Sequence, residues 1–427
     1  MIELKNINGK YAFKGVFTII LFVLWLNIYT MNIDRIQFNA KITNVVLALL
    51  LVVLSILNYK KIKLNKVHFF WLIAIISVYI SCIISVNFQS SIDYFIRFST
   101  GILIMILLGF NIESVYKSIS FIKIFSIIYL IFTYYQLISF DKYFSTISYL
   151  FNTEKLDTIF NLSTYSNRYV GLGIYAGNNA FILSLGFAIY ASLIILYKKR
   201  RIINSFIALA FACGVLLSGS RIMLINIVLS ISVILVIRSK GIFNKVKKII
   251  IFFIILLIAL SIILLIIPKS NLVFERFLNG SDSIKSRLVL YNYAYELFNS
   301  NILFGKGINT FVSLTYINPV LSEKTYVHNV FLQLLCETGI LGSIFIILPI
   351  VLTYFITLSL MEKYKYCKKI EFFLMVSIYL QTSFLMYFFT GNPIYDWNMF
   401  ITYFILISFP IGLYSKTKLK IENRRLV

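Results

Sequence analysis

The stretch that decides this fold is the one long interruption in an otherwise apolar chain, residues 268–342. It contains FGKGINTF (residues 304–311) and ends in HNVFLQLLCETGILG (residues 328–342). The sequence on either side consists of apolar runs of about 20 residues, the length that an α-helix needs to cross the hydrocarbon core of a bilayer. We therefore expect the runs to be membrane spans, and we expect the interruption to carry the chemistry.

Composition excludes a water-soluble protein and a nucleic-acid-binding one. The chain has 427 residues, of which 60% are hydrophobic and 13% are charged, and its mean hydropathy is +0.89. The core of a soluble domain of this length does not require so large a fraction of apolar residues. The net charge of +24 comes from short clusters of lysine and arginine between apolar runs. Such clusters beside spans are signals of membrane topology, so we expect no nucleic-acid partner.

Twelve apolar runs qualify as spans, so the expected fold is all-α, a single polytopic integral membrane domain over residues 1–427. Each run has the length and apolar character of a transmembrane helix. The first run has no small-residue cleavage site after it, and we expect it to be retained rather than removed as a signal peptide. The expected spans are residues 15–33, 42–58, 67–86, 96–112, 119–138, 176–197, 202–219, 221–237, 249–267, 338–360, 370–390 and 398–415.

The distribution of basic residues sets the expected orientation. With both termini in the cytoplasm, most of the 40 lysines and arginines fall in cytoplasmic segments, among them the cluster at 198–201. An excess of this kind marks the cytoplasmic loops of membrane proteins. Three features then face the other side of the membrane. They are a loop over about 139–175, a tight turn at 218–221, and one large loop over about 268–337.

Four arginines on this extracytoplasmic side are candidates for substrate binding: Arg168, Arg221, Arg276 and Arg287. Arg221 follows three small residues where two apolar helices meet, and Arg287 belongs to the first turn of a helix expected over residues 283–299. A guanidinium binds phosphate oxygens through two parallel hydrogen bonds and keeps its charge, so several of them together suit a diphosphate. The alternatives are that Arg221 snorkels to lipid headgroups and that the loop arginines are only solvated.

His328 is the candidate catalytic residue because it is the only histidine expected on this side. The other histidine, His68, lies beside a cytoplasmic basic cluster. The apolar helix that His328 opens carries Asn329, Gln333 and Glu337 at every fourth position, and a polar stripe of this kind faces a cavity or another helix. With an unperturbed pKa of about 6.5, a histidine there can act as a general base. The alternative is a packed histidine that caps the helix.

One base and one diphosphate clamp are sufficient for glycosyl transfer. The base takes the proton from an acceptor hydroxyl, and the clamp stabilises the charge that develops on the departing diphosphate. This chemistry requires no metal ion and no other cofactor, and we expect none. The acidic residues of the outer loops are too scattered to hold a hard cation; they are Glu275, Asp282, Glu296 and Glu323.

Together these motifs resemble the O-antigen ligase/polymerase superfamily. Its members are bacterial membrane glycosyltransferases of the GT-C type, Wzy-type polysaccharide polymerases among them, that use glycans linked to undecaprenyl diphosphate. The motifs cover about 168–342, and the number of spans extends the resemblance over the chain. The segments that carry it are LSGSR (residues 217–221), SR (286–287), FGKGINTF (304–311), HNVFLQ (328–333) and ETGILG (337–342).

The resemblance implies a role for most of the candidate residues. Arg221 and Arg287 match arginines held to bind the lipid diphosphate, and His328 matches the histidine held to be catalytic. Arg168 matches a looser pattern, and Arg276 rests on its position alone. The implied enzyme is metal-independent and lies in the bacterial cytoplasmic membrane. Its expected partners are an undecaprenyl-diphosphate-linked oligosaccharide, membrane lipids, a flippase and a chain-length regulator.

Three functions are open at this point. A polymerase adds the growing glycan to a new lipid-linked repeat unit of a capsular or O-antigen polysaccharide. A ligase transfers the finished glycan to another acceptor, and needs the same clamp and base. A lipid-linked oligosaccharide flippase belongs to a different class, in which internal repeats and broken spans are common. Here only Pro349 and Pro410 fall inside expected spans, and one outer loop dominates. We therefore rank the flippase last and favour the polymerase.

Overall fold

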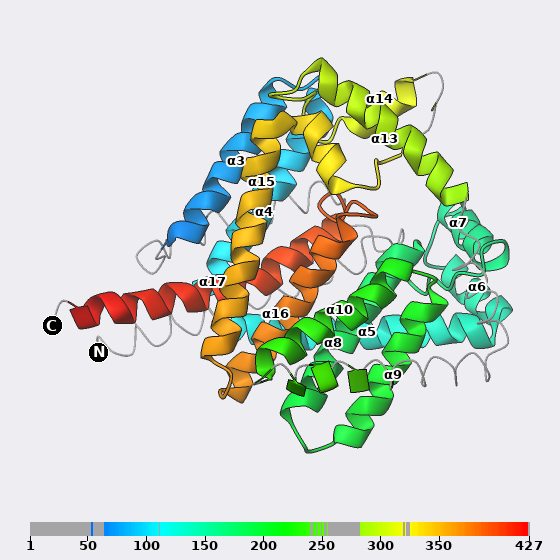
Figure 1. The fold of residues 1–427 in the computed structure, drawn as a ribbon. Coiled ribbons are helices and arrows are strands. Elements are labelled where there is room, and N and C mark those ends of the chain that lie inside the picture. Colours follow the sequence, from blue (N-terminus) through cyan, green and yellow to red (C-terminus); the bar gives the residue numbers. More distant parts are fainter. Residues whose placement is uncertain are drawn as a thin grey trace, which may run out of the picture.

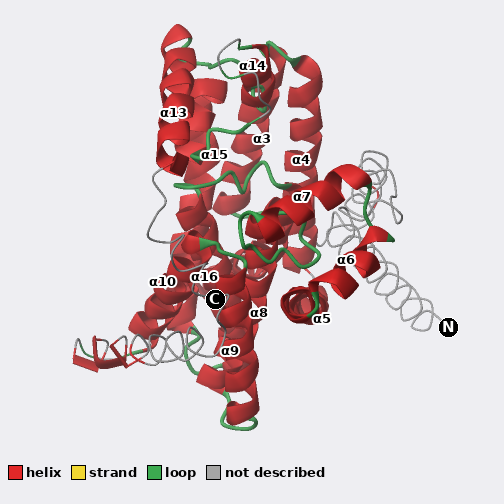
Figure 2. Cartoon of the chain, turned by 90° about the vertical axis from the view of Figure 1, so that its right-hand side faces the viewer, coloured by secondary structure: helices red, strands yellow, loops and turns green. Residues whose placement is uncertain are grey.

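The computed structural model describes residues 53, 64–110, 112–239, 241, 243–244, 246–248, 250–251, 254, 282–318, 321 and 325–425. Within these residues every regular element is helical and none is a strand, as Figure 2 shows. The expected all-α class is therefore confirmed. A chain that crosses a bilayer as helices satisfies its backbone hydrogen bonds within each span.

Eight described helices are long and apolar enough to cross a membrane, which makes the chain a multi-pass membrane protein. A ninth apolar helix, α9 (Arg201–Leu217), is shorter. All nine coincide with expected spans, whereas the spans expected at 15–33, 42–58 and 249–267 fall mainly outside the described residues, so the number twelve stays a prediction. The eight are α3 (Lys66–Ile83), α4 (Phe88–Phe110), α5 (Ile112–Ile138), α8 (Ala176–Leu196), α10 (Arg221–Arg238), α15 (Val330–Lys363), α16 (Lys368–Tyr387) and α17 (Trp397–Arg425).

The interior of the bundle consists of α8, α16 and α17. The spans of α17 and α8 are 89% and 83% buried, whereas those of α5 and α10 are only 33% buried. A helix that is apolar all round and buried all round contacts other helices on every side, and one that is apolar but exposed faces lipid. Aromatic rings fill much of the space between α16 and α17, where Phe384 and Tyr403 stack with ring centroids 4.3 Å apart.

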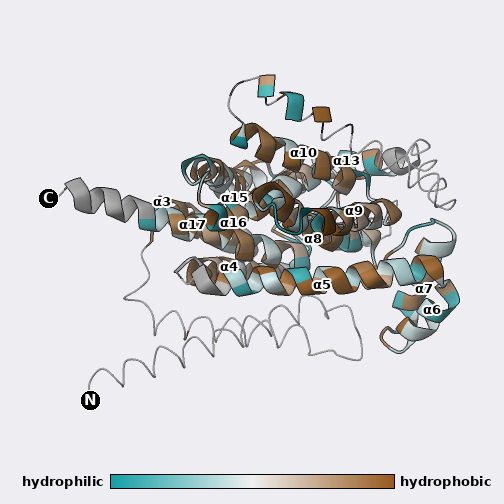
Figure 3. Cartoon of the chain, turned by 90° about the horizontal axis from the view of Figure 1, so that it is seen from below, coloured by the Kyte–Doolittle hydropathy of each residue, from teal (hydrophilic) through white to brown (hydrophobic). Residues whose placement is uncertain are grey.

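Four further helices lie outside the spans. Two of them, α6 (Phe140–Ser148) and α7 (Thr153–Thr164), occupy the expected loop at 139–175, and α13 (Asp282–Ser300) and α14 (Phe311–Ile317) occupy the large one. In Figure 1, α13 and α14 lie at the top and α6 and α7 at the right, away from the C-terminal end of α17. Figure 3 shows more hydrophilic residues on α6 and α7 than on α8 and α9. The sequence predicted α13 but not α6, α7 or α14, because short polar helices lack the apolar run of a span.

The helix α15 corrects the expected boundary of the large loop. It begins at Val330 rather than at 338, so the described loop ends at Asn329, before the expected end at 337. The helix is kinked at Gly339, where φ is 63° and ψ is −171°. A Cβ at this position would lie 2.3 Å from the Leu303 carbonyl carbon, and the next amide, that of Ile340, donates to Ile302 O at 2.9 Å. The apolar run that predicted a span from 338 thus marks the kink rather than the helix start.

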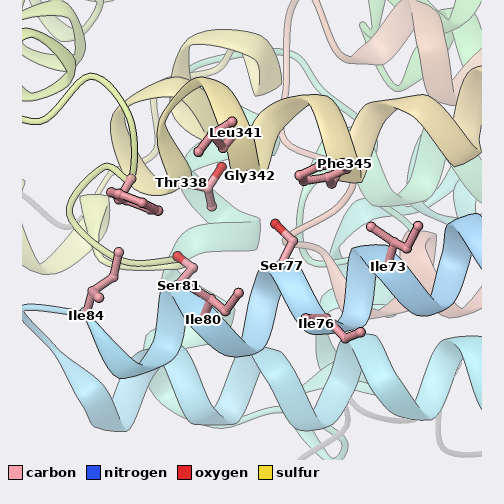
Figure 4. Close-up of a pocket in the computed structure, with 11 residues that line it drawn as sticks. Ile73, Ile76, Ser77, Ile80, Ser81, Ile84, Thr338, Leu341, Gly342 and Phe345 are labelled. Atoms are coloured by element: carbon pink, nitrogen blue, oxygen red, sulfur yellow. The ribbon is translucent and has the colours of Figure 1, made fainter.

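After the kink, α15 runs along α3. Figure 4 shows Ser77 and Ser81 of α3 facing Thr338 and Gly342 of α15 across a cavity of 140 Å³. The rest of the lining is apolar, with Ile80 of α3 among its residues. Small side chains let two helices approach closely in a membrane, where no hydrophobic force between the spans is available.

The left-handed kink should make Gly339 irreplaceable. Gly339→Ala adds a Cβ at a positive φ, at a cost of about 1–3 kcal/mol, and also forces it against the backbone of Leu303. We expect a lower unfolding temperature for the detergent-solubilised variant. Gly241→Ala is the matched control, because Gly241 has a φ of 75° with nothing within 4 Å of its Cβ position. Equal losses in the two variants would show that the close approach contributes nothing.

Candidate active site

A cavity of 570 Å³ opens where four separate parts of the chain meet. The segment before α15, the connection from α16 to α17 and the start of α8 contribute most of the lining, and α4 contributes Arg97. Several loops, green in Figure 2, cross between the group of α13, α14 and α15 and the group of α8, α9 and α10. The lining residues are Arg97, Tyr175, Gly177, Asn178, Thr325, Tyr326, His328, Tyr387, Gly391, Asn392, Tyr395, Asp396, Trp397, Asn398 and Met399.

His328 lines this cavity and is held there by its backbone. Its φ of 59° lies in the left-handed region, which a non-glycine residue adopts only when its surroundings fix it. With the amide of Asn392 oriented so that both of its polar atoms are satisfied, Asn392 Oδ1 accepts from His328 N at 3.1 Å and its nitrogen donates to Gln333 Oε1 at 3.2 Å. The helix cap is Asn329, which accepts from Leu332 N. His328 is therefore not the capping residue.

The polar stripe of α15 contacts protein rather than the cavity. Gln333 and Glu337 are 0% and 1% exposed. The Glu337 carboxylate accepts hydrogen bonds from Asn309 N (2.7 Å), Phe311 N (3.0 Å) and Gln333 Nε2 (3.1 Å), and from Tyr395 Oη (2.6 Å). These hydrogen bonds attach the segment that leads into α14, and Tyr395 beside Asp396, to α15. The stripe is thus structural, and it positions the cavity wall.

Arg287 of α13 lies close enough to His328 to change its titration. Burial, and then the positive charge of Arg287, lower the pKa of His328 below its ordinary value. Both effects disfavour the imidazolium, so the ring is neutral at pH 7 and its nitrogen is available to accept a proton. The helix α13 is held over α15 by a small apolar cluster, whose buried residues are Leu290, Ala294, Phe311, Val327 and Cys336.

Positive charge from a second segment reaches the same region. Arg287 and Arg168 both interact electrostatically with the hydroxyl of Tyr387, at the end of α16, and so does Asp396. Tyr387 lines the cavity. The structure therefore brings two of the predicted arginines toward the wall that also holds His328.

The turn before α10 packs against the side chain of Arg168. Gly219 adopts a φ of 67°, and a Cβ there would meet the Arg168 side chain, whose Cγ would be 3.3 Å away. Asn179 of α8 ties the two segments together, because its Nδ2 donates to Tyr169 O (3.0 Å) and to Ser218 Oγ (2.9 Å). Arg221 is the first residue of α10 and is half-buried.

Not every predicted residue reaches the cavity. Of the four that the structure describes, only His328 is among the residues that line it. Arg287 and Arg168 act on lining residues, and Arg221 begins α10 directly after the turn that packs against Arg168. Arg276 falls outside the described residues. The functional roles of all five stay predictions.

Two charged residues of the cavity were missed in the sequence. Arg97 belongs to the apolar helix α4 and interacts electrostatically with Tyr326, and an arginine inside an apolar helix is a recognisable signal of function. Asp396 accepts hydrogen bonds from Met399 N (3.0 Å) and from the side chain of Asn178, and its burial raises the pKa of its carboxyl. Asp396 stands alone in a short connection between spans, and nothing in its spacing sets it apart.

Comparison with known proteins bears on the same motifs. Residues 206–347 match the family model described as O-Antigen ligase. This match, over about a third of the chain, supports the resemblance to the O-antigen ligase/polymerase superfamily stated above. The matched region includes Arg221, Arg287, His328 and Glu337 but not Asp396. No curated protein matches the chain.

The matching family implies a membrane glycosyltransferase-type enzyme, and a lipid-linked glycan substrate is consistent with it. It does not support a flippase, and it does not separate a polymerase from a ligase. The flippase, ranked last from the sequence, is therefore set aside.

The coupling between Arg287 and His328 can be measured directly. We expect Arg287→Ala to raise the pKa of His328, because a positive charge that opposes imidazolium formation is removed, and we expect Arg287→Lys to raise it less. The measurement is an NMR titration of ring-labelled histidine in the detergent-solubilised protein. The chain has only two histidines, so His68→Ala assigns the signals. An unchanged titration of His328 in Arg287→Ala would contradict the proximity of the two groups.

Proposed function

We propose that this chain is a polymerase of lipid-linked oligosaccharide repeat units. It transfers a growing glycan from undecaprenyl diphosphate to a new repeat unit during synthesis of a capsular or O-antigen polysaccharide, in the bacterial cytoplasmic membrane and without a metal ion. The observation that carries the proposal is the position of His328 in the wall of a cavity, where burial and the guanidinium of Arg287 lower its pKa. The family match supports the class of reaction.

The proposed step needs one base and one leaving group. His328 takes the proton from a hydroxyl of the acceptor sugar, and the hydroxyl oxygen forms a bond to the anomeric carbon of the donor glycan. The bond between that carbon and the phosphate oxygen breaks, and its electron pair leaves with undecaprenyl diphosphate. A base that is neutral at the working pH suits the proton transfer, and fixed cations suit the negative charge that develops on the leaving oxygen.

The cavity has the size and the chemistry of a sugar-binding site. Its volume of 570 Å³ lies within the roughly 300–1,000 Å³ common for small-molecule sites. Asp396, Asn178 and Asn392 offer polar groups for sugar hydroxyls, and Tyr326 and Trp397 offer aromatic faces. We assign Asp396 to sugar binding rather than to proton transfer, because Met399 N and the Asn178 side chain already donate to it.

The diphosphate is assigned to the arginines beside the cavity. Arg287 acts on His328 and on Tyr387, and Arg168 also acts on Tyr387. Arg221 starts α10 next to the turn on which Arg168 packs. Cations from α13, from the segment before α8 and from α10 would thus surround one end of the donor. Arg276 is retained in the clamp on its sequence position alone.

A ligase is the second candidate, since the matching family is described by that name. The two reactions differ in the acceptor and share the clamp and the base. The deciding experiment is elongation by the purified protein with defined lipid-linked repeat units as the only glycan. Long products from these units alone support the polymerase. Products that form only after addition of a different acceptor, such as lipid A-core, would assign the chain as a ligase.

His328 should be required for polymer formation. We expect His328→Ala to abolish elongation in the purified system while the protein stays in the membrane, because no other group of the site is assigned to accept the proton. Elongation by the unmodified protein should fall on acidification with a midpoint below the ordinary histidine pKa of about 6.5, as the neutral base is lost. His68→Ala is the matched control. Normal polymer from the His328→Ala variant would refute the assignment.

The clamp should respond to the shape of the cation as well as to its charge. Arg221→Ala and Arg287→Ala should weaken binding of the lipid-diphosphate donor more than Arg221→Lys and Arg287→Lys do, because lysine keeps the charge and loses the two-pronged contact. Donor affinity is measured by direct binding to the solubilised protein. Arg200→Ala, at the other end of α9, controls for net charge. Unchanged donor affinity in both alanine variants would count against the clamp.

A further inference from the structure

A second cavity, of 660 Å³, lies at the end of the bundle opposite the candidate active site. The active site takes the first residues of α8 and has Arg221 at the start of α10 nearby. This cavity lies between the later halves of the same two helices and α9. Its lining residues are Phe187, Ala191, Ile194, Ile195, Arg201, Ser205, Ala208, Leu209, Ala212, Ile231, Leu235, Arg238, Lys248 and Ile251.

The walls of this cavity are apolar, and small residues make the space. Ala191 of α8 and Ala208 and Ala212 of α9 stand where larger side chains would fill the gap between the two helices. Beyond the mouth, the walls offer no charged side chain among the lining residues. A polar metabolite placed there would lose its hydrogen bonds to water without replacement. A hydrocarbon chain would lose nothing.

The mouth of the cavity is positively charged. Arg238, at the last turn of α10, forms an ion pair with Glu371 at 2.6 Å and donates to Ile195 O at 3.2 Å. These contacts fix its position and offset its charge. Arg201, the first residue of α9, and Lys248 lie on the same rim and are exposed. An apolar chamber with a cationic rim is complementary to an amphiphile that has an anionic head.

We propose that this cavity binds an anionic glycerophospholipid, with its acyl chains between α8, α9 and α10 and its phosphate between Arg201 and Lys248. Basic pockets between transmembrane helices on the cytoplasmic side bind anionic headgroups in this way. The clusters of lysine and arginine place this end of the bundle on the cytoplasmic side. The proposal does not depend on the proposed function, because none of the active-site residues lines this cavity.

The test is equilibrium binding of labelled phosphatidylglycerol to the delipidated full-length protein in mixed micelles. Phosphatidylcholine with the same acyl chains and inorganic phosphate are the comparison ligands. We expect Arg201→Ala and Lys248→Ala each to lower the affinity for phosphatidylglycerol about fivefold, the contribution of one basic residue near an anionic surface. Phosphatidylcholine should bind more weakly, and phosphate alone should not compete. His328→Ala should bind phosphatidylglycerol as the unmodified protein does.

Two further variants keep the test decisive. Lys199→Ala removes a charge from the same connection at a residue that does not line the cavity, and its affinity should be unchanged. Ala208→Leu fills the chamber without changing charge and should lower both the affinity and the rise in unfolding temperature that the lipid produces. Equal losses in Lys199→Ala and Arg201→Ala would overturn the proposal in favour of general electrostatic attraction. Displacement of bound phosphatidylglycerol by an equal concentration of a polyprenyl phosphate, with an affinity that depends on Arg201 and Lys248, would also overturn it.

Discussion

The buried carboxylate of Glu337 is the interaction on which the outer half of this protein depends. An ionisable group inside a membrane helix is costly unless its hydrogen-bonding capacity is filled. Four donors fill it, two of them backbone amides of the segment that leads into α14. Those amides have no acceptor in a helix or sheet. The carboxylate therefore provides their hydrogen-bond acceptors, and they provide two of its donors. The extended loop can be buried against α15 only because of this exchange.

The same network extends to His328 through one more side chain. Gln333 Nε2 donates to Glu337, while Gln333 Oε1 accepts from Val327 N at 3.3 Å and from the Asn392 amide. Asn392 in turn accepts from His328 N. The left-handed backbone of His328 is therefore fixed from both sides, by the residue before it and by the connection from α16 to α17. Because the backbone of His328 is fixed in one conformation, the imidazole is already positioned before the substrates bind. Proton transfer between bound groups requires a base that is positioned in this way.

Sequence periodicity predicted the parts of the fold that lipid dictates, and it could not predict the parts that depend on contacts between distant segments. The nine described apolar helices follow from their runs of apolar residues. The four-residue spacing of Gln333 and Glu337 correctly placed them on one face of a helix, but spacing cannot say whether the facing surface is a cavity or a loop. The facing surface is the loop, because the segment FGKGINTF folds back onto α15. Asp396 could not be predicted as a site residue for the same reason, because its position in the cavity depends on a contact with the distant Asn178 of α8.

The charges of the site have a consequence for the order of events in the proposed reaction. Arg287 lowers the pKa of His328 in the empty site, so the base is neutral but weak. A donor diphosphate bound to Arg287 would bring negative charge to the same guanidinium and offset its effect on the imidazole. By Coulomb's law the affinity of His328 for a proton would then rise, and the rise would be larger in a cavity with little water than in solution. The base would thus become stronger when the donor is in place, and one arginine would serve both to hold the leaving group and to adjust the base to its presence.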